Sequence, residues 1–174
     1  MRMKCRNVNV GLTMYLKQAQ HSPAAAYRAA LLLENEHMGQ AAAQQFYMRA
    51  ARGGYVPAMW KVAGLLITGQ YVSSSEDSWG SYTQDCSQGF AWIQTAAKTG
   101  DSTANYLLAR CYLDGIGVER SRSAALYFLE RVTFPEDSMN PYEPIEVLVF
   151  GSVSPDLKDC ANCIQKVNSL MPTG

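Results

Sequence analysis

Residues 104–118 read ANYLLARCYLDGIGV, and residues 125–128 follow them as ALYF. Small and bulky side chains recur at helical spacing on either side of Gly115 and Gly117. Because glycine ends helices and permits left-handed turns, this pattern predicts two short helices joined by a glycine turn. The stretch therefore indicates one helical hairpin.

Weaker copies of this hairpin lie upstream. Residues 58–69, AMWKVAGLLITG, repeat its first half with small, aromatic and bulky residues at the same offsets. Residues 25–33, AAYRAALLL, form a third copy that lacks the closing glycine. The second half recurs at 46–54 and 92–100, where an aromatic residue precedes an alanine pair and a glycine. Because such a hairpin cannot bury its apolar face alone, we expect the copies to stack into an α-solenoid.

The spacing of the copies agrees with a regular stack. Phe46, Trp92 and Phe128 hold the same place in the second half and lie 46 and 36 positions apart. The longer interval contains an insertion between Gly69 and Cys86 that is rich in Ser and Tyr. Insertions into repeat proteins fall in loops, so this segment is predicted to leave the stack.

The alanines and aromatic residues have separate roles in the predicted packing. A methyl side chain allows two helices of a hairpin to approach closely where they cross. Large aromatic side chains then fill the gaps between successive hairpins. We expect this of Trp60, Trp92, Tyr106, Tyr112 and Phe128.

The unit resembles the Sel1-like repeat, a relative of the tetratricopeptide repeat. Residues 101–133 match that family's signature in length without a gap, and the resemblance covers residues 23–133. Two departures are Ala109, where the family has Gly, and Val132-Thr133, where it has an alanine pair. The matching residues are Ala104, Leu108-Ala109, Tyr112, Gly115-Ile-Gly117-Val118, Ala125 and Phe128.

The resemblance implies an all-α, right-handed α/α solenoid of about three helical hairpins that fills residues 1–174 as a single domain. A leading helix is expected over 8–20 because His21-Ser22-Pro23 interrupts the chain there. A divergent hairpin is expected to cap the C-terminal end of the stack, since an uncapped end would expose apolar surface. The predicted repeats are 23–54, 55–100 and 101–133, and the predicted cap is about 141–171.

Composition excludes several classes of partner. Of 174 residues, 48% are hydrophobic and 17% are charged, which is typical of a folded globular protein. The 15 basic and 15 acidic residues cancel and form no Lys/Arg run, so nucleic acid is not an expected partner. No apolar run approaches the roughly 20 residues of a membrane span, so no membrane insertion is expected. We expect a cytoplasmic protein, with export by a signal-independent secretion system as the alternative.

The five cysteines are expected to be structural, and no cofactor is predicted. Cys111 occupies a core position of its helix, where free cysteine is common. Cys160 and Cys163 form a lone C-x-x-C, and zinc would need two further ligands. The histidines, His21 and His37, lie far away in sequence. A thiol or metal role for the Cys160–Cys163 pair remains an alternative.

The predicted function is protein–protein interaction, with another protein or a peptide as the partner. In hairpin solenoids the first helix of each repeat lines the concave surface, so the non-core positions of these helices are candidates for recognition. Trp and Tyr are enriched in binding hot spots, and the insertion carries both. The candidate contact residues are Arg28, Lys61, Asn105, Arg110, Trp79 and Tyr82.

No catalytic residues are predicted. The sequence carries no nucleophile elbow, phosphate-binding loop or dinucleotide fingerprint. The resemblance implies an adaptor or scaffold, including bacterial effectors and toxin-neutralising immunity proteins. It also implies one enzymatic alternative, because some similar proteins are linked to β-lactam hydrolysis. Ser87, Ser102 and the histidines give no recognisable arrangement of nucleophile and base for that reaction.

Overall fold

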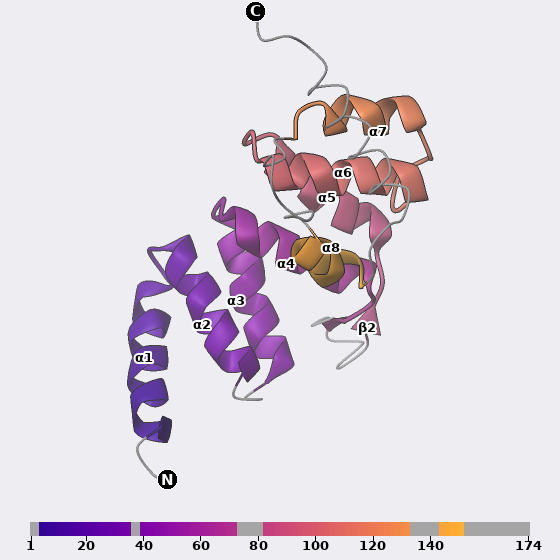
Figure 1. The fold of residues 1–174 in the computed structure, drawn as a ribbon. Coiled ribbons are helices and arrows are strands. Elements are labelled where there is room, and N and C mark those ends of the chain that lie inside the picture. Colours follow the sequence, from indigo (N-terminus) through magenta and orange to yellow (C-terminus); the bar gives the residue numbers. More distant parts are fainter. Residues whose placement is uncertain (1–3, 36–38, 73–81, 133–142, 152–174) are drawn as a thin grey trace, which may run out of the picture.

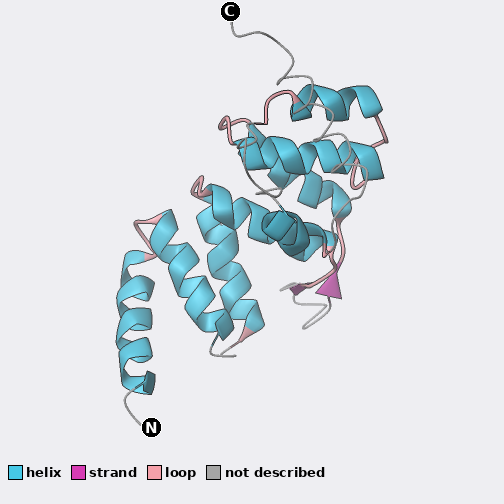
Figure 2. Ribbon diagram, in the orientation of Figure 1, coloured by secondary structure: helices cyan, strands magenta, loops and turns pink. Residues whose placement is uncertain are grey.

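The computed structural model is helical apart from one short strand pair (Figures 1 and 2), and it describes residues 4–35, 39–72, 82–132 and 143–151. The elements in chain order are α1 (Lys4–Gln18), α2 (Pro23–Asn35), α3 (Gln40–Arg52), α4 (Val56–Ile67), β1 (Tyr71–Val72), β2 (Tyr82–Thr83), α5 (Cys86–Ala97), α6 (Ser102–Asp114), α7 (Arg122–Leu129) and α8 (Glu143–Phe150).

The helices pack in consecutive pairs, as predicted. Helix α2 packs on α3, α4 on α5, and α6 on α7, while α3 on α4 and α5 on α6 join the pairs into one stack (Figure 1). Helix α1 adds to the N-terminal side by packing on α2. We call α2, α4 and α6 the first helices and α3, α5 and α7 the second helices.

The sequence marks the ends of these helices with capping residues. The Asp101 carboxylate accepts a hydrogen bond from the Ala104 N–H at 2.7 Å and starts α6. Asp85 starts α5 in the same way, through the Gln88 N–H at 2.8 Å. Helix α6 ends at Gly115 with φ of 74°, and Gly117 follows with φ of 70°, which confirms the predicted glycine turn.

Buried alanines recur along the first helices of the pairs. Seven of them are 0% exposed: Ala26, Ala29, Ala30, Ala58, Ala63, Ala104 and Ala109. Two core clusters surround them, one centred on α1–α4 and the other on α5–α8. Trp60 and Trp92 are partly buried and pack against both clusters. These two indoles therefore connect the N-terminal and C-terminal parts of the stack.

Aromatic rings join three neighbouring helices in the C-terminal part. The Tyr112 ring on α6 stacks on the Phe128 ring of α7 with centroids 5.6 Å apart and an interplanar angle of 10°. The Phe90 ring of α5 meets the same tyrosine edge-on, also at 5.6 Å. The Phe90 contact joins successive hairpins, as expected for Tyr112, whereas the Phe128 ring stacks on Tyr112 within their own hairpin.

Two features were not predicted. The insertion is closed by an antiparallel strand pair, in which Tyr71 pairs with Thr83 and Val72 with Tyr82. Helix α8, the described part of the predicted cap, has its main contacts with α4 in the middle of the stack rather than with α7. Residues 152–171 of that predicted cap lie outside the described residues.

Replacing Gly117 with alanine should destabilise the fold more than the same change at Gly100. Both glycines have positive φ, 70° and 83°, so a side chain costs roughly 1–2 kcal/mol at either position. At Gly117 an added Cβ would also overlap the backbone carbonyl of Cys86, whereas nothing lies within 4 Å at Gly100. We expect an additional loss of about 1–3 kcal/mol for Gly117→Ala, measured by urea unfolding. Equal losses for the two variants would contradict this packing.

Candidate interaction surface

The first helices carry side chains that meet on one side of the stack. An ion pair between Glu34 of α2 and Lys61 of α4 bridges the first two of these helices. Helix α8 contacts both Gly64 of α4 and Arg110 of α6, and so bridges the second and third of these helices. We call the side of α2, α4 and α6 that carries Glu34, Lys61, Gly64 and Arg110 the first-helix surface.

One end of this surface is built around a buried tyrosine. The Tyr47 hydroxyl donates to a Glu34 carboxylate oxygen at 2.6 Å, and the Lys61 ammonium donates to the other oxygen at 2.9 Å. Tyr47 is 1% exposed and belongs to α3, so the three residues connect α2, α3 and α4. The Lys61 ammonium also lies 5.6 Å from the centroid of the Tyr47 ring.

The electrostatics of this cluster fix its protonation states. Burial raises the pKa of Glu34, but the hydrogen bonds from Tyr47 and Lys61 outweigh burial and lower it below its usual value. Burial and the hydrogen bond to Glu34 together raise the pKa of Tyr47. At neutral pH the cluster therefore holds an ionised Glu34 carboxylate and a protonated Tyr47 phenol. This arrangement ties α2, α3 and α4 together.

The middle of the surface is covered by α8. A Cβ built at Gly64 would lie 2.9 Å from the Leu148 carbonyl oxygen and 3.1 Å from the Val149 Cα, so the two backbones approach closely. Val149 is 0% exposed. The guanidinium carbon of Arg110 lies 4.5 Å from the centroid of the Phe150 ring. The first-helix surface thus already holds a segment of polypeptide.

Arg110 is held in place from its own helix as well. Its Nε donates to a carboxylate oxygen of Asp114 at 2.9 Å, four residues further along α6. The Arg110 side chain is 6% exposed, and a buried cation requires a partner of this kind. Asp114, which precedes the glycine turn, therefore neutralises the charge beneath α8.

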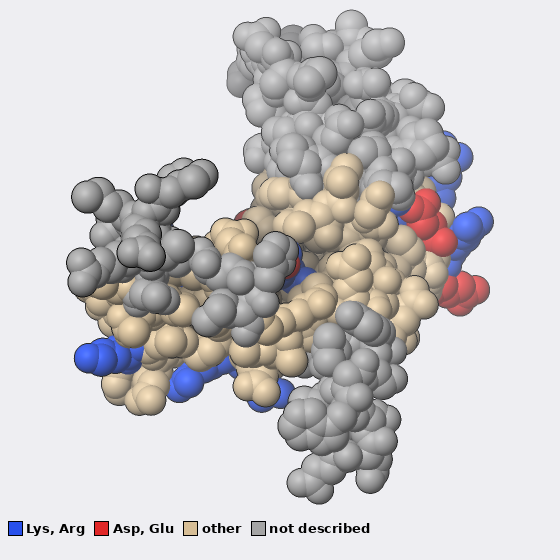
Figure 3. Space-filling model, turned by 90° about the horizontal axis from the view of Figure 1, so that it is seen from below, with Lys and Arg blue, Asp and Glu red and all other residues tan. Residues whose placement is uncertain are grey.

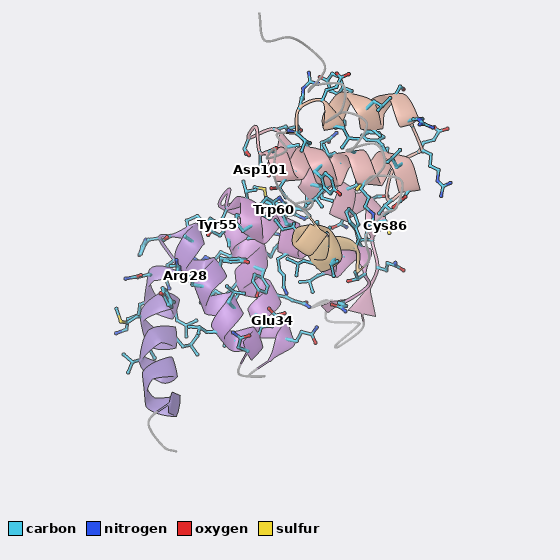
Figure 4. All side chains as sticks on the ribbon, in the orientation of Figure 1. Arg28, Glu34, Tyr55, Trp60, Cys86 and Asp101 are labelled. Atoms are coloured by element: carbon cyan, nitrogen blue, oxygen red, sulfur yellow. The ribbon has the colours of Figure 1, made fainter. Side chains whose placement is uncertain are left out.

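The predicted contact residues occupy different environments. Arg28 is exposed on α2 and lies about two turns before Glu34 (Figure 4). Lys61 is on the first-helix surface but is paired with Glu34. Asn105 and Arg110 are 7% and 5% exposed, so the expectation that they stand open to a partner is wrong. Trp79 lies outside the described residues, and for Tyr82 only the pairing of its backbone in β2 is described.

The sequence missed two parts of this surface. Arg110 is covered because α8 returns to the middle of the stack, and no local pattern indicates such a long-range contact. The cluster at Glu34 depends on Tyr47 from a second helix, and no local pattern indicates that contact either. The sequence gives no local sign of the role of Glu34, because its partners Tyr47 and Lys61 lie 13 and 27 positions away.

The described residues offer little else for binding or chemistry. They contain no group of three or more His, Cys, Asp or Glu residues that could hold a metal ion, and Cys160 and Cys163 lie outside them. Burial raises the pKa of the Cys111 thiol to about 12, so it is protonated at neutral pH. Within the described ranges, no helix has the length and apolar character needed to cross a bilayer. Figure 3 shows Lys and Arg scattered over one face of these residues rather than gathered into a patch.

Comparison with known proteins identifies the fold. A Sel1 repeat protein from Oxalobacter formigenes superimposes with a TM-score of 0.60 at 19% identity, over 87% of this chain and 97% of its own. A protective antigen present in uropathogenic Escherichia coli strains, described as displaying an SLR fold, gives a TM-score of 0.56 at 18% identity. That match covers 94% of this chain but only 36% of the antigen. The chain therefore has the fold of Sel1 repeat proteins. No protein-family model matches the sequence, and no curated protein matches it either.

Lowering the pH should weaken the stack through Glu34. The folded-state pKa of Glu34 is lowered from 4.5. The stability that the ionised carboxylate contributes to the fold is therefore present above that value and is lost as pH falls through the folded pKa. At neutral pH, Glu34→Gln should lower the free energy of unfolding by about 0.5–1.5 kcal/mol. This difference from the parent should shrink between about pH 5 and pH 3 in urea titrations.

Glu130→Gln provides the control, because Glu130 is exposed at the C-cap of α7 and the change removes the same charge. A Glu34→Gln difference that stays constant with pH would contradict the inferred ionised cluster.

Proposed function

We propose that this protein is a non-enzymatic interaction module that binds another protein or a peptide on its first-helix surface. The single observation that carries the proposal is α8, a segment of the chain itself, seated on this surface against Gly64 and Arg110. The similarity to Sel1 repeat proteins supports the proposal, because stacked hairpins present long continuous surfaces. The narrower effector and immunity roles remain hypotheses about the partner.

The chemistry of the described residues supports binding rather than catalysis. A nucleophile or general base needs a pKa near the working pH or an adjacent activating group. Burial instead raises the pKa of the Cys111 thiol to about 12, away from a neutral working pH. Burial and the bond to Glu34 likewise keep the Tyr47 phenol protonated. Both groups serve the core of the stack.

The α2 end is the part of the first-helix surface where a partner has direct access. Arg28, which is expected on the recognition face, is exposed on α2, and the Glu34 side chain is 40% exposed. Helix α8 has its main contacts with α4. The surface offers charges of both signs at this end, which favours a partner with complementary polar groups.

Reversing the charge of Arg28 should weaken partner binding. Arg28→Glu leaves the buried core unchanged, so we expect normal thermal stability and at least a fivefold loss of affinity, since rim charges act mainly on association. The partner is first captured from lysate by cross-linking to the parent protein, and its affinity for each variant is then measured by biolayer interferometry.

Arg49→Glu is the matched control. Arg49 is also exposed and belongs to the same helical pair, but it lies on the second helix α3. If Arg28→Glu binds like the parent while Arg49→Glu loses affinity, the partner contacts the second helices and the proposed surface is wrong.

A further inference from the structure

Helix α8 presents two different apolar faces. Val149 is 0% exposed, and Ile145, four residues earlier on the same side of the helix, packs with Phe150 against the C-terminal core cluster. Val147 and Leu148 point away and are each 47% exposed. The inner face of α8 therefore supplies its contacts with the stack, and its outer face contributes little to them.

The surface under α8 is formed by equivalent positions of two repeats. Gly64 and Arg110 are each six residues beyond the first core alanine of their helices, Ala58 and Ala104. Gly64 lets the α8 backbone approach α4, and Arg110 stacks on the Phe150 ring. Repetition of the hairpin thus places a backbone contact and an aromatic contact side by side.

Helix α8 depends on this surface for its structure. It is 8 residues long, and isolated helices shorter than about 12–15 residues are marginal in water. Docking against α4 and Arg110 therefore supplies much of its helicity. A helix held by one fully buried side chain and two partly buried ones can be replaced by a competitor with the same inner face.

We propose that the surface of α4 and α6 under α8 is a recognition site for a short apolar helix, and that α8 occupies it as an internal ligand. The occupant is defined by what α8 presents: an aliphatic residue, a β-branched residue four positions later, and an aromatic residue directly after it. The backbone at the β-branched residue lies against Gly64, and the aromatic ring lies on the Arg110 guanidinium. A partner bearing this pattern displaces α8. This inference rests on the proposed interaction function and names its ligand.

A synthetic peptide of residues 143–151 with a fluorescent label tests the site on the full-length protein. The parent should bind this peptide weakly because its own α8 is in place. Val149→Asp places a charge in the buried contact and releases α8, so the peptide should bind at least tenfold more tightly, since apparent affinity scales with the fraction of open sites. A peptide that carries the same Val149→Asp change should bind to neither protein. Fluorescence anisotropy measures all four combinations.

Two further variants separate release of α8 from general loosening. Val147→Asp introduces the same charge on the exposed side of the same helix and should bind the peptide like the parent. Adding Gly64→Val to Val149→Asp fills the place of the α8 backbone and should abolish the gained affinity. Circular dichroism establishes that each variant is folded. If Val149→Asp is not, Phe150→Ala replaces it, with the same expected gain in affinity.

Several results would overturn the inference. The first is that neither Val149→Asp nor Phe150→Ala gains affinity, and the second is that Val147→Asp gains as much as Val149→Asp. A dimeric parent that Val149→Asp converts to a monomer would assign the site to α8 of a second copy and would also overturn it. The peptide experiment uses no external partner. If the peptide gains no affinity but Arg28→Glu still weakens partner binding, only this inference is rejected. If the peptide gains affinity but Arg28→Glu does not weaken partner binding, only the proposed contact at α2 is rejected.

Discussion

The close approach of paired helices at buried alanines is the constraint on which the rest of the structure depends. Each first helix contributes at least two alanines that are 0% exposed, and α2 contributes three. A methyl group is small enough to let the helix axes come together, and a larger side chain would force them apart. Because this approach recurs in each pair, the pairs stack in register. The larger side chains then find fixed gaps to fill between them.

Polar contacts add to this apolar stack where helices from different pairs meet. Glu34 and Lys61 join α2 to α4, with Tyr47 of α3 between them. Gln44, 3% exposed, donates from α3 to the Gln70 carbonyl at 2.8 Å, just beyond the end of α4. Such bonds contribute modestly to stability but require one relative position of the helices. They add directional contacts to a core that otherwise rests on apolar packing.

The sequence predicted the fold well because its determinants are local and repeated. The helical hairpin around residues 104–128 and the turn at Gly115 and Gly117 follow from residue types within a few positions. The candidate surface was predicted only in part. The repeat identified which positions of the first helices face the same side, including Arg110. It did not indicate that α8 covers that arginine. The contact joins segments about forty positions apart, and neither segment carries a local pattern that indicates it.

The equivalence of Gly64 and Arg110 extends to Leu31 of α2, which is also six residues beyond its first core alanine, Ala25. One backbone position, repeated along the solenoid, thus carries an aliphatic side chain, none at all, and a cation. Each position in this row is set by a single residue. Single substitutions there would change the ligand preference of the surface while the alanine-spaced scaffold stays the same.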